Sequence, residues 1–157
     1  MESIKLKTIK LVCFEKKNDE HLKYLKRLLS DESIMSRFQG IFPALVSRNE
    51  FFDKGFFIGY NGELIGCILF GNYNSDSRSV YIRGFALDKE HRGIMLNDKR
   101  LSQIAHDEVV QYIFDTYNEI DSIKISVSPD NIAGNRSAIR YGYSHDSDTN
   151  YSKSRWI

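Results

Sequence analysis

The chain has 157 residues, of which 41% are hydrophobic and 27% are charged, and 22 Lys and Arg balance 21 Asp and Glu. This length predicts one domain spanning residues 1–157, with a core large enough to need no metal or disulfide. The balanced charge argues against nucleic acid or an anionic membrane as a partner. No uncharged apolar run approaches the ~20 residues that span a bilayer.

The cysteines and histidines are typical of an intracellular protein without a metal. Cys13 and Cys67 each lie in a strand-like apolar run, which favours buried free thiols over a disulfide and suits the reducing cytosol. The residues before Cys13 alternate lysine with apolar side chains and lack the continuous apolar centre of a signal peptide. The four histidines show no paired metal-ligand spacing. We therefore expect a cytoplasmic protein with no metal site.

The amino-terminal third predicts a strand followed by helices. Apolar residues recur with a period near two over Ile4–Phe14, which favours a strand. Asn18 and Asp19 are both suitable N-caps for a helix over Glu20–Leu29. The segment Ser33–Glu50 is less regular and predicts a short, broken second helix. The expected buried stripe of the first helix is Leu22, Leu25, Leu28 and Leu29.

Three antiparallel strands are expected next. Phe56–Tyr60 and Glu63–Phe70 flank an Asn-Gly pair at 61–62, and such a loop favours a type I′ hairpin because both residues take positive φ. A polar tip then leads into a third strand, Val80–Leu87. Gly84 inside that strand predicts a β-bulge that splays it.

The carboxyl-terminal half predicts a strand–helix–strand unit. Asp98–Tyr117 has a helical apolar face, Ile123–Val127 alternates as a strand, and a short helix after it ends at Gly142. A right-handed crossover makes Val80–Leu87 and Ile123–Val127 parallel, and Tyr151–Ile157 is expected as a last edge strand. The fold class is therefore α+β: a mixed, mostly antiparallel sheet with helices on both faces.

Two segments lie at the carboxyl ends of the parallel strands, where ligands usually bind. The first, Leu87–Asn97, leads into a helix whose dipole and backbone N–H groups suit a phosphate, although taken alone it is more simply a solvated turn. The second, Ser128–Tyr143, places Asn131 as an N-cap whose amide is also available to a ligand. Tyr141 lies on the same helical stripe, where core packing is the simpler interpretation.

Together the two segments resemble the GNAT superfamily of acyl-CoA-dependent N-acetyltransferases, nearest to the branch of ribosomal-protein N-terminal acetyltransferases. Asp130-Asn131 followed by Tyr-Gly-Tyr at 141–143 is similar to the family pattern, and Glu-His-Arg-Gly at 90–93 resembles the start of its pyrophosphate loop. The order of strands and helices also matches over essentially the whole chain. The resemblance therefore implies a GNAT-like fold.

The sequence departs from that family at four positions. Met95 and Asn97 replace the two small residues of the pyrophosphate loop, where glycine permits positive φ and close backbone approach. Gly134 stands where a small hydroxyl residue is usual, and Ala138 stands where many members have a tyrosine acid. These departures favour an alternative, a catalytically inactive GNAT-fold module that binds a ligand or a protein partner.

The resemblance implies acetyl-CoA as the acyl donor and direct attack by a primary amine of a small molecule or a protein. Backbone groups of Phe85 and Leu87 would hold the pantetheine arm, and Tyr141 is the candidate catalytic acid. The strand Val80–Leu87 has no carboxylate where relatives often place a base. The implied donor-binding residues are Phe85, Ala86, Leu87, Arg92, Gly93, Ile94, Met95, Leu96, Asn97, Asn131 and Asn135.

The acceptor and the assembly stay open at this point. The resemblance puts acceptor choice in Ser33–Phe57 and Gly71–Ser79, and the phenylalanines of the first segment either line a pocket or cap the core. No acidic cluster there demands a polyamine or an aminoglycoside. An unrelated α+β binding domain is the remaining interpretation, and the sequence is compatible with a homodimer.

Overall fold

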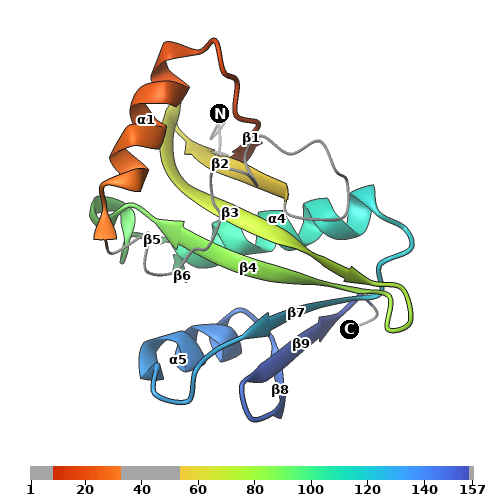
Figure 1. Cartoon of the computed structure of the whole chain (residues 1–157). Helices are drawn as coiled ribbons and strands as arrows, with labels where there is room; N and C mark the ends of the chain where they lie inside the picture. Colours follow the sequence, from red (N-terminus) through yellow and green to blue (C-terminus); the bar gives the residue numbers. More distant parts are fainter. Residues whose placement is uncertain (1–8, 33–53, 156–157) are drawn as a thin grey trace, which may run out of the picture.

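The computed structural model describes residues 9–32 and 54–155. Seven strands form one sheet in the order β1-β2-β3-β4-β7-β9-β8, and β5 and β6 form a separate two-stranded ribbon (Figure 1). The start of the predicted first strand at Ile4 and the predicted broken helix over Ser33–Glu50 lie outside the described residues. The last two residues of the predicted final strand, 156–157, lie outside them as well.

The first described elements are β1 (Ile9–Val12), which pairs antiparallel with β2, and the helix α1 (Asp19–Leu29). Asn18 caps this helix, because its side chain accepts a hydrogen bond from the backbone N–H of His21 at 3.1 Å. The predicted helix is therefore confirmed, and of the two predicted caps Asn18 is the one that serves, while Asp19 is the first helical residue.

The buried face of α1 differs from the predicted stripe. Leu25 and Leu28 are buried, but Leu22 and Leu29 are 40% and 46% exposed. Tyr24 is buried in their place, one turn before Leu28. The helix is rotated so that this aromatic ring, rather than the two outer leucines, packs on the sheet.

The antiparallel hairpin forms as predicted. β2 (Lys54–Tyr60) and β3 (Glu63–Asn74) are joined by Asn61 and Gly62, whose φ angles are 57° and 80°. Positive φ at both positions is the mark of a type I′ turn. β4 (Ser79–Leu87) then pairs antiparallel with β3.

β4 carries the predicted bulge. Leu69 of β3 pairs with Gly84, whereas the next residue of β3, Phe70, pairs with Ile82. Arg83 is therefore the extra residue of β4. A bulge of this kind bends its strand and increases the local twist.

The predicted crossover is also present. The helix α4 (Leu101–Thr116) connects β4 to β7 (Ser122–Ser126), and the two strands run parallel. Their pairing covers three residues of each strand, from Ser79 to Tyr81 on β4.

The predicted last strand forms over Asn150–Ser154, but it does not lie at the edge of the sheet. After α5 (Ile132–Arg140), the chain forms β8 (Ser144–Ser147) and then β9 (Asn150–Ser154). β9 lies between β7 and β8, so the edge strand is β8 and not the segment from Tyr151. All four residues of β8 are exposed and none is apolar, so hydrophobic periodicity gives no signal for it.

Helices cover both faces of the sheet. α4 and the end of α5 contribute to one core, which includes Phe70, Ile123 and Tyr143. α1 packs on the other face with Phe57 and Leu69. Figure 1 shows α1 and α4 on opposite sides of the strands β2 to β4, and α5 beside β7. The fold is the mixed α+β sheet that the sequence predicts.

None of the helices in the described part of the chain combines the length and the apolar character that crossing a membrane requires.

Candidate active site

A cleft opens where β4 and β7 stop pairing, beyond Tyr81 and Lys124. Its volume is about 470 Å³, and its walls are the second half of β4, the end of β7, α5 and one side chain of α4. Phe85, Asn131 and Tyr141, all predicted site residues, line it. The cleft therefore lies at the carboxyl ends of two parallel strands, as expected.

The three predicted residues at the end of β4 face different ways. The backbone N–H of Asp88 donates to the carbonyl of Ile65 on β3 at 2.7 Å. Counting back along an antiparallel ladder, the backbone groups of Ala86 also face β3, and those of Phe85 and Leu87 face the opposite side. Phe85 lines the cleft, whereas Ala86 and Leu87 are each 2% exposed and lie outside its lining.

The segment predicted as a pyrophosphate loop is a folded ribbon. β5 (Met95–Leu96) pairs antiparallel with β6 (Lys99–Arg100), and Asn97 and Asp98 form the turn with φ of 50° and 69°. The prediction that the long helix starts at Asp98 is wrong, because positive φ at that residue is incompatible with a right-handed helix. The helix starts at Leu101 instead.

Residues at both ends of the ribbon make hydrogen bonds within the chain, and the backbone N–H of Arg92, one of the predicted donors, bonds to the carbonyl of Lys89 at 3.2 Å. The backbone N–H of Leu101 donates to the carbonyl of Ile94 at 2.8 Å, and Nε of Arg92 donates to the carbonyl of Leu87 at 2.8 Å. Gly93 has a φ of 85°. The segment 92–97 is therefore not an open cradle of backbone amides. The first turn of α4 has no acidic or capping side chain, so the positive end of its dipole stays uncompensated.

Met95 does not block the cleft. Its side chain is 54% exposed and lies outside the cleft lining.

Asn131 borders the cleft at the start of α5. Its Oδ1 accepts the backbone N–H of Gly134 at 2.8 Å, so it is the predicted N-cap. A Cβ on Gly134 would come within 2.5 Å of Nδ2 of Asn131 and 2.9 Å of Cγ1 of Val127. The glycine therefore lets the asparagine fold over the first turn. Among residues 9–32 and 54–155, Nδ2 of Asn131 has no hydrogen-bond acceptor, so it remains a donor for a ligand.

The structure does not bring Asn135 to the cleft. Its Nδ2 donates to the carbonyls of Ser128 and Asn131 at 2.9 and 2.8 Å, and its Oδ1 accepts the hydroxyl of Tyr151. It lines a separate groove on the far side of α5. Asn135 thus holds α5 to β9, and both N–H groups of its amide are engaged within the chain.

Tyr141 both lines the cleft and packs against the core. Its ring stacks on His106, with centroids 4.3 Å apart and planes 15° apart. The ring of Phe85 stands edge-on to both, at 5.4 Å from His106 and 6.2 Å from Tyr141. Within the described part of the chain the Tyr141 hydroxyl makes no hydrogen bond, so it can donate to a ligand.

His106 lines the cleft but was not predicted as a site residue. It is 2% exposed, its Nε2 lies 3.2 Å from the hydroxyl of Tyr143, and its Nδ1 is buried without a partner. Burial, together with the charge of Lys153, lowers the pKa of His106 to about 3, so the ring is neutral near pH 7. The sequence signal was a histidine on the apolar face of a predicted helix.

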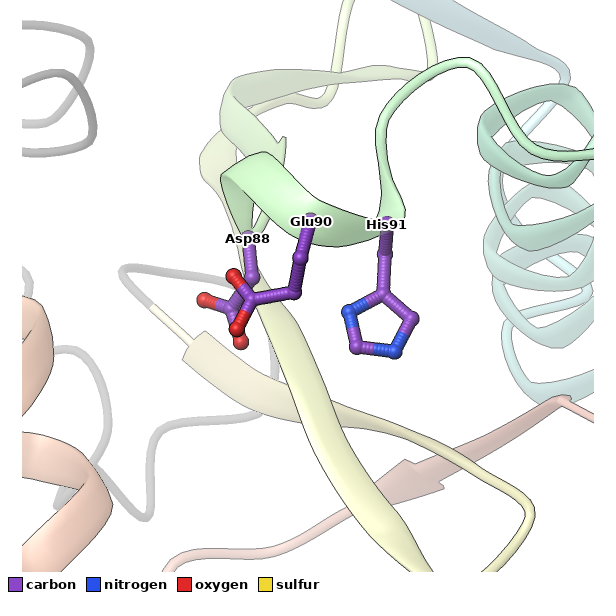
Figure 2. Close-up of side chains that lie close together, drawn as sticks. All are labelled: Asp88, Glu90 and His91. Carbon is purple, nitrogen blue, oxygen red and sulfur yellow. The ribbon is translucent and has the colours of Figure 1, made fainter.

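Three potential metal ligands meet just after β4. Figure 2 shows Asp88, Glu90 and His91 side by side, and their ligand atoms lie within 4.8 Å of one another. Both carboxylates, however, bind the guanidinium of Arg27 on α1, at 3.2 Å for Asp88 and 2.9 Å for Glu90. A metal ion would have to displace that guanidinium. We therefore interpret the cluster as a link between α1 and the segment after β4.

A larger cavity, of about 710 Å³, lies between α1, β1 and the β2–β3 hairpin. Its lining mixes cations such as Lys10 and Lys23 with the acids Glu20 and Glu63. It contains none of the predicted site residues. The smaller cleft between β4 and β7 is therefore the candidate active site.

A bulged strand that parts from a parallel neighbour, with a helix starting at the mouth of the gap, is the arrangement expected of an acyl-CoA-dependent acetyltransferase. The model of the acetyltransferase (GNAT) family matches residues 17–136. The chain belongs to this family.

Solved structures show the same fold. RimL, the ribosomal L7/L12 alpha-N-protein acetyltransferase in complex with coenzyme A, is 16% identical with a TM-score of 0.66, and the match covers 94% of each chain. The Campylobacter jejuni N-acetyltransferase PseH in complex with acetyl coenzyme A is 19% identical with a TM-score of 0.58, over 94% of this chain and 99% of that one. A probable acetyltransferase is 20% identical with a TM-score of 0.53, over 66% of this chain and 62% of its own length. No curated protein matches the sequence significantly.

Proposed function

We propose that this protein transfers an acetyl group from acetyl-CoA to a primary amine, which attacks the thioester directly. The observation that carries the proposal is the 470 Å³ cleft between β4 and β7. Membership of the GNAT family supports it, as do the coenzyme A and acetyl coenzyme A complexes of RimL and PseH.

The cleft suits the pantetheine arm of the donor. An extended arm can lie along β4, where the backbone of Phe85 faces away from β3, and Nδ2 of Asn131 can donate from the opposite wall. A backbone N–H directed at the thioester oxygen stabilises the charge that develops there. Holding donor and amine in line lowers the barrier by as much as ~7–11 kcal/mol.

The structure offers fewer binding groups for the diphosphate of the donor than for its pantetheine arm. The uncompensated dipole of α4 attracts an anion, and Arg92 adds positive charge at the strand end. The ribbon formed by β5 and β6, however, already pairs part of the local backbone. We therefore expect the arm to contribute more to donor binding than the diphosphate does.

Tyr141 is the residue that we assign to proton transfer. As the nitrogen–carbon bond forms and the carbon–sulfur bond breaks, the departing thiolate takes the Tyr141 hydroxyl proton. The acceptor nitrogen releases its proton to water, and the Tyr141 phenolate takes a proton back from water. The stack on His106 holds the ring in the cleft. A thiol whose pKa is about 8.5 leaves readily even unaided, so the acid contributes rate without being indispensable.

One alternative has structural support, a catalytically inactive module that binds a ligand or a protein partner. The closed ribbon at 95–100 favours it, since it reduces the donors for a diphosphate. Ala138, at the position where many family members carry an acid, is 1% exposed and offers no proton.

A melting curve with and without acetyl-CoA tests the binding step. A ligand at ~100 times its dissociation constant adds about 2.7 kcal/mol and shifts the midpoint by several degrees. We expect a positive shift. No shift at millimolar acetyl-CoA would contradict the proposed donor and leave the inactive module as the better description.

Mass detection of acetylated products from a panel of amines tests the chemical step. Tyr141→Phe should lower kcat roughly 10²-fold and leave the acetyl-CoA shift unchanged, since it removes a proton donor and keeps the ring. Tyr112→Phe, on α4 and outside the cleft lining, is the matched control. Binding without any product would identify an inactive module, and an unchanged kcat in Tyr141→Phe would remove Tyr141 from the mechanism.

A further inference from the structure

We call the point where β4 and β7 separate the vertex of the cleft. Two side chains at the vertex lie on the face of the sheet opposite α5. The last pair before β4 and β7 separate is Tyr81 with Lys124. Their neighbours Val80, Ile82 and Ile123 are buried in the core under α4. Because side chains alternate along a strand, Tyr81 and Lys124 lie on the other face of the sheet.

The register extends this row across the sheet. Gly71 of β3 pairs with Tyr81, and Ser152 of β9 pairs with Lys124. Ser144 of β8 pairs in turn with Ser152. The residues on either side of Tyr81 and Lys124 are therefore glycine and serine, which leave room beside the lysine.

A contact of β9 confirms the orientation of the row. The Nζ of Lys153 donates to the carbonyl of Tyr141 at the end of α5, at 2.7 Å. Ser152, the preceding residue, therefore faces away from α5, and Lys124 beside it does the same. The donor cleft is walled by α5 on one face, so the acceptor reaches the vertex from the face that carries this row.

Lys124 supplies positive charge at the vertex. It is partly buried, and among the described residues its ammonium has neither an ion pair nor a hydrogen bond. Arg83, the exposed bulge residue, adds a second cation on β4. Of the nearby acids, Asp121 at the start of β7 is paired with Arg78 at 3.0 Å. Asp146 lies two strands away on β8, roughly 10 Å by the usual strand spacing.

We propose that the acceptor is a primary amine that also carries a phosphate or carboxylate group, and that Lys124 binds this anionic group. The inference rests on the proposed function, because it takes the acetyl thioester of a donor lying in the cleft to end at the vertex. It names the acceptor class that the sequence left open.

The same charge also helps the reaction. Cations near the acceptor disfavour its ammonium form, so its pKa falls and more of the reactive free amine is present. The bound ammonium gives its proton to water before attack. The lysine thereby offsets the lack of a carboxylate base in β4. A polyamine, in contrast, meets repulsion at this position.

Matched amines test the proposal. Acetyl-CoA is held at saturation, and products of phosphoethanolamine, β-alanine, ethanolamine, propylamine and spermidine are measured by mass spectrometry. We expect kcat/KM for the first two to exceed that for ethanolamine and propylamine by at least roughly tenfold, since a charge-assisted hydrogen bond is worth about that much. The ratio between phosphoethanolamine and β-alanine distinguishes phosphate from carboxylate.

Variants assign the effect to the lysine. Lys124→Met should raise KM for the amines that carry an anionic group roughly ten- to hundredfold. The KM for ethanolamine should change little. Lys124→Glu should reverse the preference toward spermidine. Lys23→Met, which removes an exposed lysine on α1, is the matched control. Circular dichroism checks folding, and Lys124→Gln replaces any variant that does not fold.

The outcomes separate this inference from the proposed function. Equal or better turnover of spermidine, or of amines that carry no anionic group, overturns it while leaving acetyl transfer intact. So does a Lys124→Met protein that behaves like Lys23→Met. Absence of the acetyl-CoA melting shift overturns both proposals together.

Discussion

The two ends of the proposed donor site differ in how much of their backbone is already paired. At one end, β4 and β7 share three residue pairs and then part, so the backbone N–H and C=O of Phe85 face away from β3 and lie beyond the last pair with β7. At the other end, β5 pairs with β6, and Ile94 accepts the first amide of α4 from Leu101. One end is open before any ligand arrives, and the other is closed on itself.

The difference shows that the presence of a family motif and the readiness of a site are separate properties. A bulge at Arg83 bends β4 beside the cleft, and no backbone pairing between β4 and β7 has to be broken there for a ligand to enter. The ribbon must give up pairing before its amides can bind a diphosphate, and that loss reduces the net affinity. The comparison therefore predicts that changes at the cleft have larger effects than changes at the ribbon.

The largest effect is expected from closing the cleft. Gly134→Val adds a branched side chain where a Cβ alone would lie 2.5 Å from Asn131 and 2.9 Å from Val127. We expect the acetyl-CoA melting shift to disappear, which corresponds to at least a hundredfold weaker binding. Ile139→Ala, at a 58% exposed position of the same helix, is the control and should keep the shift. A normal shift in Gly134→Val would mean that the arm does not pass Asn131.

The second effect is a pH dependence of stability that comes from His106, which lines the cleft. His106 is held neutral, with a pKa of about 3 against about 6.5 in an unfolded chain. Its contribution to stability is present above pH 6.5 and is lost as the pH falls toward 3, because the unfolded state then binds a proton that the folded state does not. The loss approaches ~1.4 kcal/mol per pH unit in that window.

Urea titrations at pH 7, 6, 5 and 4 measure this loss. His106→Phe keeps an aromatic ring against Tyr141 and has no proton to bind, so its stability should fall less steeply. Burial raises the pKa of the Asp88 carboxyl, which acts in the opposite sense, but both proteins share that group. Parallel curves for the two proteins would show that His106 is not held neutral.

The third effect measures how much the ribbon end of the site contributes to donor binding, by comparing two donors. Acetyl-pantetheine lacks the diphosphate and the nucleotide, so it probes the cleft alone. Because the ribbon is closed, we expect its dissociation constant to exceed that of acetyl-CoA by only about tenfold, or about 1.4 kcal/mol. Calorimetric titration of both donors gives the ratio. A ratio above a thousandfold would show that the diphosphate end dominates binding.

Most of the sheet was predictable because its strands alternate or are bounded by turn residues. The hairpin at 61–62 was found from Asn-Gly between two apolar runs, and the bulge from Gly84 in a strand. β8 was missed because Ser144–Ser147 has no apolar residue, and its pairing depends on β9. Strand order at this edge is a tertiary property that local pattern does not encode.

The sequence predicted where the candidate site lies. It did not predict which of the polar groups there are already hydrogen-bonded within the chain. Asn131 and Asn135 both carry amides on one short segment, yet both N–H groups of the Asn135 amide are engaged within the chain, whereas Nδ2 of Asn131 is not. The ribbon was missed because its strands are two residues each, too short to show a period, and because Asp98 was predicted as the first residue of the long helix. His106 was missed because a histidine on an apolar face usually packs without a function.

The smallest expected effect comes from making the two turns alike. Asp98→Gly turns Asn97-Asp98 into Asn-Gly, the pair found at 61–62, and glycine adopts the φ of 69° at position 98 without strain. We expect the ribbon to gain roughly 0.5 kcal/mol. Since the diphosphate competes with that pairing, acetyl-CoA should bind about twofold more weakly, whereas acetyl-pantetheine should bind as before. Gly62→Asp, the reverse exchange in the other hairpin, should lower stability and leave the ratio of the two donors unchanged. If Asp98→Gly weakens both donors equally, the ribbon does not oppose the diphosphate, and the two ends of the site are not independent.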